Sequence, residues 1–166
     1  MGDLELTSSA FSDGGEIPRE CGYKNENEQP PLAIFGIPDE AESLALIMDD
    51  PDAMGAVGKV WVHWVVWNII PCKNNYASGA KHAEIEDLYD HQMKETIYRE
   101  GMTDFEDQAG YGGPAPPDKR HTYVFKLYAL DCELELAGAE ATKADVEKAM
   151  EGHIIEQTQL TGTYAP

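Results

Sequence analysis

Trp61-Val62-His63-Trp64-Val65-Val66-Trp67-Asn68-Ile69-Ile70 is the stretch of the sequence that decides the fold. Trp, Val and Ile favour strands because their broad or branched side chains pack well on a pleated surface. Pro71 follows directly, and proline cannot donate to the hydrogen-bond ladder of a sheet interior. We therefore predict a strand over 61–70 that ends at Pro71.

The histidine inside this run is a candidate functional residue. Successive side chains of a strand point to opposite faces, so His63 is predicted to share one face with Trp61 and Val65. Val62 and Trp64 are then predicted to share the other face. A single histidine in an apolar strand is more often a satisfied core residue than a ligand contact, so His63 alone does not establish a site.

Further strands are predicted on both sides of this run. Leu4–Phe11 alternates roughly and ends in the turn Ser12–Gly15. Ser43–Met48 is short and apolar and is stopped by Asp49-Asp50-Pro51-Asp52, which indicates a buried strand with acidic residues at its end. His121–Leu130 alternates around Tyr123, Phe125, Leu127 and Ala129 and is the third strong strand.

The evidence for helix concentrates near the C-terminus. Thr142 can cap a helix there. Five residues then recur at the spacing of one helix face: Val146, Ala149, Met150, His153 and Ile154. His153 is expected to face the core. Over Ala83–Arg99 the pattern leaves helix or ordered loop open. A chain of strands with a helix near its end predicts a single mainly β domain over 1–166, built of packed sheets with peripheral helices.

The charge balance argues against several classes of partner. The 166 residues include 31 Asp and Glu against 12 Lys and Arg, a formal net charge of −19. Nucleic acids and anionic membrane surfaces are bound through clusters of Lys and Arg, which this chain lacks. No apolar run approaches the roughly 20 residues of a membrane span, so no stable membrane insertion is expected. The first residues lack the basic and apolar regions of a secretory signal, which favours a cytoplasmic protein.

No cofactor is predicted either. Cys21, Cys72 and Cys132 are widely spaced and form no C-x-x-C pair, so they are interpreted as reduced thiols rather than a disulfide framework or a zinc site. The sequence contains no G-x-G-x-x-G or P-loop motif of nucleotide-binding folds.

Two more motifs complete a candidate site. Pro51 is rigid, so the turn Asp50-Pro51-Asp52 can hold two carboxylates at the end of a buried strand, although a turn that caps its own amides is as common. The loop Gly110–Pro117 is rich in glycine, whose backbone can direct successive N–H groups toward an anion, and in proline, which stiffens it. A purely structural turn is the alternative. The strand that follows places His121 and Tyr123 on one face.

Together these motifs resemble the phosphatidylethanolamine-binding protein family, also called the Raf kinase inhibitor family, and in particular its bacterial and archaeal branch. The resemblance extends over nearly the whole chain and is weakest over Lys73–Gly101. It rests on these stretches: Leu6–Phe11, Asp50–Ala53, Trp61–Ile69, Gly110–Pro117, His121–Leu130, Lys148–Ile154 and Gly162–Tyr164.

The resemblance implies a β-sandwich-like fold with flanking helices and a shallow cavity for phosphate, acetate or a phosphoryl head group. By motif match, the residues implied to line this cavity are Asp50, Asp52, His63, Gly113, Pro114, His121 and Tyr123. Met54 stands where a proline is frequent one residue beyond Ala53, so the rim is expected to differ. Ala115 stands where prokaryotic relatives often carry cysteine, which argues against thiol chemistry there.

The expected role is binding rather than catalysis. Asp50 or Asp52 is expected to orient and charge His63 or His121, while loop amides and the Tyr123 hydroxyl supply further donors to a small anion. A regulatory role on a protein partner such as a kinase or a protease is a second expectation that the resemblance allows.

Enzymatic alternatives stay open at this stage. His63, His121 and an Asp could form a facial triad around a metal. A hydrolase is less favoured, because no G-x-S-x-G motif is present and Ser8 and Ser9 have no neighbouring base in the sequence.

Overall fold

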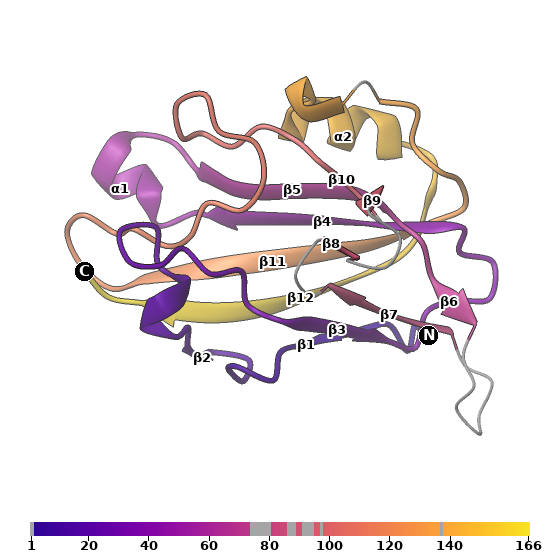
Figure 1. Cartoon of the computed structure of the whole chain (residues 1–166), viewed down its shortest axis with the longest axis horizontal. Helices are drawn as coiled ribbons and strands as arrows, with labels where there is room; N and C mark the ends of the chain where they lie inside the picture. The colour runs from indigo at the N-terminus through magenta and orange to yellow at the C-terminus, as the bar shows by residue number, and fades with distance from the viewer. Residues whose placement is uncertain (1, 74–80, 86–88, 91–94, 97, 137) are drawn as a thin grey trace.

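The computed structural model describes residues 2–73, 81–85, 89–90, 95–96, 98–136 and 138–166 (Figure 1). Its largest sheet has six strands in the order β10-β5-β4-β11-β12-β2. Neighbouring strands run antiparallel except β12 and β2, which are parallel. The strands are β2 (Gly15–Glu16), β4 (Ser43–Asp50), β5 (Trp61–Ile69), β10 (Arg99–Glu100), β11 (His121–Leu130) and β12 (Ile154–Tyr164).

A smaller sheet of four strands has the order β1-β3-β7-β6. Its members are β1 (Glu5–Thr7), β3 (Leu32–Phe35), β6 (Cys72–Lys73) and β7 (Lys81–Ile85). β8 (Tyr89–Asp90) and β9 (Glu95–Thr96) form a separate pair. The helices are η1 (Arg19–Cys21), α1 (Ala53–Val57), η2 (Gly138–Glu140) and α2 (Lys143–Met150). None of these helices has the length and apolar character needed to cross a bilayer.

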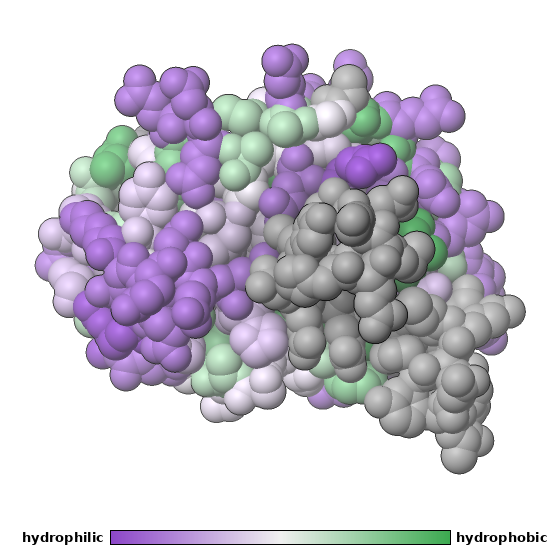
Figure 2. Space-filling view, in the orientation of Figure 1, coloured by the Kyte–Doolittle hydropathy of each residue, from purple (hydrophilic) through white to green (hydrophobic). Residues whose placement is uncertain are grey.

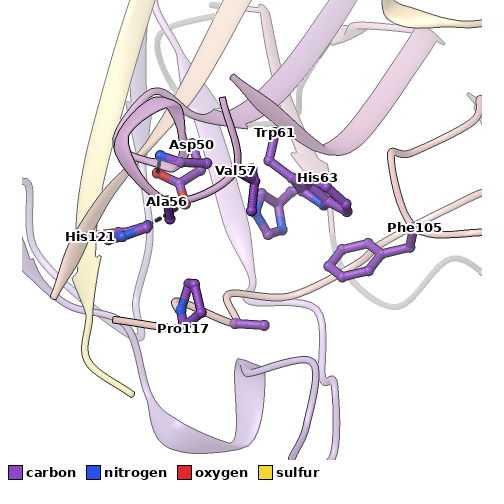
Figure 3. Close-up of a pocket in the computed structure, with 10 residues that line it drawn as sticks. Asp50, Ala56, Val57, Trp61, His63, Phe105, Pro117 and His121 are labelled. Carbon is purple, nitrogen blue, oxygen red and sulfur yellow. Dashed lines mark hydrogen bonds and ion pairs between the residues drawn. The ribbon is translucent and has the colours of Figure 1, made fainter. Parts of the chain in front are cut away.

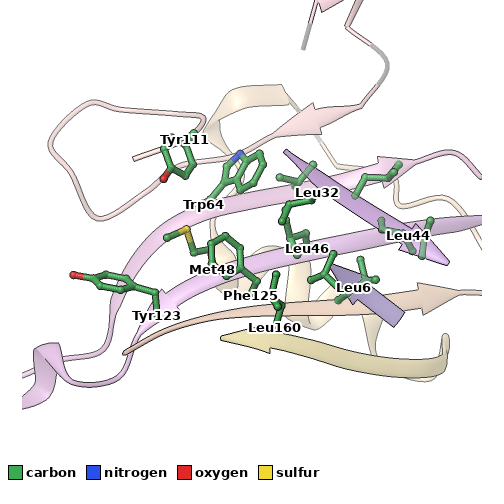
Figure 4. Packing of buried hydrophobic residues seen from close by; sticks show 14 of the residues in the cluster. Leu6, Leu32, Leu44, Leu46, Met48, Trp64, Tyr111, Tyr123, Phe125 and Leu160 are labelled. Atoms are coloured by element: carbon green, nitrogen blue, oxygen red, sulfur yellow. The ribbon is translucent and has the colours of Figure 1, made fainter. Parts of the chain in front are cut away.

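The main hydrophobic core lies between the two sheets (Figure 4). Leu6 and Leu32 of the small sheet belong to one buried cluster with Leu46 and Phe125 of the large sheet. A second cluster covers the opposite face of the large sheet, where Trp67 packs with residues of α2. Hydrophilic residues cover much of the surface seen in Figure 2. The predicted mainly β fold of packed sheets with flanking helices is confirmed.

The strong strands form where the sequence predicts them. β11 has the predicted bounds, and β5 ends one residue earlier, at Ile69. β4 extends beyond its apolar run and includes Asp49 and Asp50 as its last two residues. Over Leu4–Phe11 only β1 is strand, so that prediction was too long.

The C-terminal helix is shorter than the periodicity suggests. Thr142 is its N-cap, and its hydroxyl and the Asp145 carboxylate form a capping box. The helix ends at Met150, and Ile154 already belongs to β12. His153 lies between them and is exposed, with its Nδ1 2.7 Å from Asp131 Oδ1, so the expectation that it faces the core is wrong.

Over Ala83–Arg99 the structure decides between the two alternatives only in part. The described residues of this range, apart from Tyr98, belong to strands β7, β8, β9 and β10, so a continuous helix is excluded. Leu88, which contributed to the helical pattern, lies outside the described residues.

β5 carries a bulge that reverses the predicted alternation. Met48 of β4 pairs with Trp64, but the next residue, Asp49, pairs with Val62. His63 is therefore the extra residue of the bulge and has no partner on β4. Trp64 consequently lies in the core between the sheets, whereas Val62 packs against the cluster beneath α2. The prediction that these two residues share a face is therefore wrong.

The bulge also decides where His63 points. Its ring packs edge-on against Tyr123, a core residue, with ring centroids 5.1 Å apart. Val65 belongs to the opposite cluster, so the predicted shared face with Val65 is wrong as well. Trp61 and His63 do lie together, since both line the same cavity. The extra residue turns the histidine from the helix-covered face toward the sandwich side.

A second irregularity of β5 lies at Asn68, whose φ of 54° is in the left-handed region. The side chain accepts a hydrogen bond from Leu134 N at 2.7 Å and donates one to Leu134 O at 3.0 Å. These two bonds hold the segment after β11 on the sheet. Asparagine suits the position because it tolerates the left-handed backbone and supplies both a donor and an acceptor.

We predict that Asn68→Ala lowers the free energy of unfolding by about 1–3 kcal/mol, because two hydrogen bonds are lost and alanine disfavours this backbone conformation. Asn68→Gly tolerates the conformation but also lacks the bonds, so it should be less destabilising than alanine. Urea unfolding of the three proteins measures this order, and an alanine variant as stable as the wild type would contradict it.

Candidate functional site

A cavity of about 190 Å³ opens beside α1, where β4 ends and β5 and β11 begin (Figure 3). Its walls are mostly apolar, and the ionisable side chains among them are Asp50, His63 and His121. The strands bring these groups together because β4 lies between β5 and β11 in the sheet. The other lining residues are Ala53, Ala56, Val57, Trp61, Phe105, Ala115 and Pro117.

His121 is held between two carboxylates. Its Nδ1 lies 2.6 Å from Asp50 Oδ2, and its Nε2 lies 2.8 Å from Asp118 Oδ1. A carboxylate only accepts hydrogen bonds, so each ring nitrogen must donate. The ring is 0% exposed. His121 is therefore a buried imidazolium.

The charge of His121 results from two opposing influences. Burial by itself lowers the pKa of the imidazole, but the hydrogen bonds and charges of Asp50 and Asp118 outweigh it and raise that pKa above the usual 6.5. The bond to His121 in turn lowers the pKa of the Asp118 carboxyl. The expectation that Asp50 charges a histidine is met at His121.

His63 is in the opposite state. Its Nδ1 lies 2.7 Å from Gly112 O, which only accepts, so Nδ1 carries the hydrogen. Burial lowers the pKa of this imidazole, and the nearby backbone carbonyls and carboxylates offset that only in part. The ring is therefore neutral at pH 7, and its Nε2 is an acceptor. The cavity thus contains one charged and one neutral histidine.

Two buried donors stand beside the cavity without a hydrogen-bond partner among the described residues, Trp61 Nε1 and Tyr123 Oη. Burial raises the pKa of the Tyr123 phenol, and the Asp50 charge raises it further, so the hydroxyl keeps its proton. Tyr123 is fully buried behind the lining residues and packs on the rings of His63 and His121. It supports the two histidines rather than lining the cavity.

Asp52 does not reach the cavity lining. Its Oδ2 accepts a hydrogen bond from Thr122 N at 2.8 Å and so ties the turn after β4 to the start of β11. Of the two acids in the Asp50-Pro51-Asp52 turn, only Asp50 lines the cavity. Asp50 also caps an amide of its own turn, because its Oδ1 accepts a hydrogen bond from Ala53 N at 3.2 Å.

The glycine loop is docked on the protein rather than opened toward a ligand. Gly113 N donates to Asn27 Oδ1 at 2.7 Å, and Gly112 N donates to His63 O at 2.9 Å. Pro114 O accepts from Tyr23 N at 3.0 Å. The expected contribution of loop amides to anion binding is therefore wrong for Gly112 and Gly113. Gly113 and Pro114 lie behind the cavity wall, where they position Ala115.

The sequence did not single out Asp118 or Phe105 as site residues. Asp118 lies three residues before His121, a spacing that lets a side chain fold back across a turn, but acids in turns are too common to mark a site. Phe105 belongs to a segment without any motif. Its ring packs edge-on against His63 with centroids 5.4 Å apart and stacks on Tyr23 at 4.0 Å.

The metal and hydrolase alternatives gain no geometric support from the described part of the chain. The group of side chains there that could hold a metal ion is Asp131, Cys132 and His153, whose ligand atoms lie within 4.8 Å of one another. Asp131 and Cys132 directly follow Leu130, the last residue of β11, whereas His121 is its first residue, so this group lies at the other end of that strand from the cavity. Ser8 Oγ donates to Pro31 O at 2.7 Å and accepts from Ala10 N at 3.1 Å, so it shapes a turn.

Comparison with known proteins places this site in a family context. The model of the phosphatidylethanolamine-binding protein family matches residues 7–165. A UPF0098 protein of Methanothermobacter thermautotrophicus is 42% identical over 97% of this chain and 98% of its own. A UPF0098 protein of Chlamydia muridarum is 38% identical with the same coverage of both chains.

Solved structures agree in fold over almost the full length. A phosphatidylethanolamine-binding protein homologue from Chlamydia trachomatis superposes with a TM-score of 0.79 at 34% identity, covering 99% of this chain and 98% of that one. YbcL of E. coli, described as a member of the mammalian family, gives 0.78 at 27% identity and covers 98% of both chains.

We predict that the pKa of His121 lies above the ordinary value of 6.5 and that the pKa of His63 lies below it. His121 should stay doubly protonated above that pH, and its ion pair stabilises the fold fully below pH 6.5 and loses this effect as the pH rises through the raised folded pKa. His63 should stay neutral below it, with its hydrogen on Nδ1. Imidazole ¹⁵N resonances followed with pH report both states, and two histidines titrating together at 6.5 would contradict the assignment.

Gly113→Ala is expected to lower the free energy of unfolding by about 1–3 kcal/mol, because a Cβ there would lie 1.9 Å from Cys21 O, a backbone atom that cannot swing aside. Gly55→Ala is the matched control, since nothing lies within 4 Å of a Cβ at that helical position. It should leave stability unchanged or raise it by up to about 1 kcal/mol. Equal unfolding midpoints for both variants would show that the loop is not docked as described.

Proposed function

The chain belongs to the phosphatidylethanolamine-binding protein family, and from that premise we propose that its cavity binds a small phosphoryl group or a similar oxyanion. The observation that carries the proposal is the imidazolium of His121 in a cavity whose walls are mostly apolar. The N–H group of an imidazolium is a charge-assisted donor, and it binds an anion more strongly in a partly dry site than in water. Such a contact can act locally in a chain whose net charge is −19.

The neutral histidine adds a preference for a protonated ligand. His63 Nδ1 is engaged by Gly112 O, so only Nε2 can contact a ligand, and it can only accept a hydrogen bond. A phosphoryl monoanion, such as dihydrogen phosphate or a singly protonated phosphate monoester, offers both an oxygen for the His121 N–H and an O–H for His63. Sulfate is fully deprotonated near neutral pH and would leave His63 opposite another acceptor. We therefore propose that phosphate-type monoanions are preferred over sulfate.

A binding role fits these residues better than catalysis. The described lining residues contain no Ser, Thr or Cys that could act as a nucleophile. Ala115 stands at the position where prokaryotic relatives often carry cysteine. Binding without chemical conversion is accordingly part of the proposal.

A protein partner and the cellular location belong to the same proposal. Met54 and Val57 of α1 are 54% and 50% exposed, and Val57 lines the cavity. This apolar rim is a contact surface for a partner such as a kinase or a protease, whose binding ligand occupancy could alter. A cytoplasmic location remains part of the proposal.

The proposal is tested by titrating inorganic phosphate and sulfate separately into ¹⁵N-labelled protein at constant ionic strength. Phosphate should shift the imidazole resonances of His63 and His121, with an affinity that falls as the pH rises through the His121 titration. Loss of one hydrogen bond should weaken sulfate about tenfold relative to phosphate. His121→Ala, checked for folding by circular dichroism, should abolish the shifts. No shift of either histidine up to about 10 mM phosphate would overturn the proposal.

A further inference from the structure

An acidic side chain of the protein itself already occupies the donor that the proposed ligand needs. Asp118 Oδ1 lies 2.8 Å from His121 Nε2, the ring nitrogen that Asp50 does not use. An imidazolium has two N–H groups, and Asp50 already takes the one on Nδ1, so the ring can offer a ligand no other donor. A phosphoryl oxygen that binds His121 must therefore take the place of the Asp118 carboxylate.

The two carboxylates on His121 differ in how easily they can leave. The Asp50 side chain is 4% exposed, and its other oxygen accepts a hydrogen bond from Ala53 N at 3.2 Å. Its removal from His121 would leave an uncompensated charge inside the protein. The Asp118 side chain is 45% exposed and returns directly to water when it leaves. Only the outer of the two carboxylates is exchangeable.

The position of Asp118 in the chain permits this exchange without a change of fold. It follows the cavity-lining residue Pro117 and lies outside helices and strands, in an exposed stretch that ends at Arg120. Rotation of one side chain is enough to free His121 Nε2. No strand of the large sheet has to move.

We propose that Asp118 is an internal ligand of His121 that an incoming oxyanion displaces, and that Asp118 thereby sets the affinity and the charge preference of the site. The inference rests on the proposed function. In the exchange the hydrogen bond from His121 to Asp118 breaks, and one from His121 to the ligand forms. Protons and covalent bonds stay where they are.

The exchange favours ligands with a single negative charge. With Asp118 in place, the charges of His121, Asp50 and Asp118 add up to minus one. A monoanion replaces Asp118 charge for charge, whereas a dianion leaves one negative charge more beside Asp50. The released Asp118 stays on the rim and repels a more highly charged ligand there. This preference agrees with the acceptor that His63 presents.

The test compares phosphate binding by the wild type, Asp118→Asn and Asp118→Ala, measured by isothermal titration at constant ionic strength and pH. The variants should bind phosphate about two- to fivefold more tightly, since the partly exposed ion pair of Asp118 with His121 no longer competes. In the wild type, the carboxyl ¹³C resonance of Asp118 should move toward that of a free aspartate as phosphate saturates the site.

Glu106→Gln is the matched control, because Glu106 is exposed and adjoins the lining residue Phe105. It removes one negative charge near the cavity without touching His121. Tighter phosphate binding by the Asp118 variants than by Glu106→Gln supports the inference. Phosphate binding by the Asp118 variants alone, with none by the wild type or Glu106→Gln, supports it as well. If the wild type binds phosphate and the Asp118 variants do not exceed the control, the exchange is wrong and the proposed function stands. If no protein binds phosphate, both are overturned.

Discussion

The hydrogen bond between Asp50 Oδ2 and His121 Nδ1 joins two strands where their backbone pairing has ended. β4 and β11 pair from Ser43 with Leu130 as far as Asp49 with Val124, and beyond that point side chains connect them. An ion pair this deeply buried is stable only when both partners are present, because either one alone would be an unpaired charge in the protein interior. The cavity, the charge of His121 and the position of α1 all depend on this contact.

β4 supplies acids to both faces of the sheet in consecutive residues. Asp49 points to the helix side, where its Oδ2 accepts from Lys126 at 3.1 Å and from Lys143 of α2 at 3.0 Å. Asp50 points to the cavity. The alternation of a strand thus separates the ion pairs that anchor α2 from the ion pair in the cavity, which holds His121. A shift of the register by one residue would exchange these two roles.

Much of the fold could be predicted because it is encoded locally. The apolar and β-branched runs of β4, β5 and β11 have strand propensity and clear limits, and Thr142 marks the start of α2. The failures have an equally physical cause. The bulge at His63 depends on pairing with β4, and the early end of α2 depends on β12 starting at Ile154 to complete the sheet. Neither is visible in a local pattern.

The same division applies to the site. By itself the sequence determined which chemical groups are available: carboxylates after a buried strand, a histidine in β5, and a second one at the start of β11. Only the tertiary structure decided that Asp50 rather than Asp52 holds His121, and that Asp118 takes its other nitrogen.

The tertiary structure also decided that Gly113 N donates its hydrogen bond to Asn27 rather than to a ligand. Most of these choices depend on contacts between residues far apart in the chain, 71 positions for Asp50 and His121 and 86 for Asn27 and Gly113. Local propensities carry no information about such contacts, because their geometry exists only once distant strands have paired and the loops have packed on them.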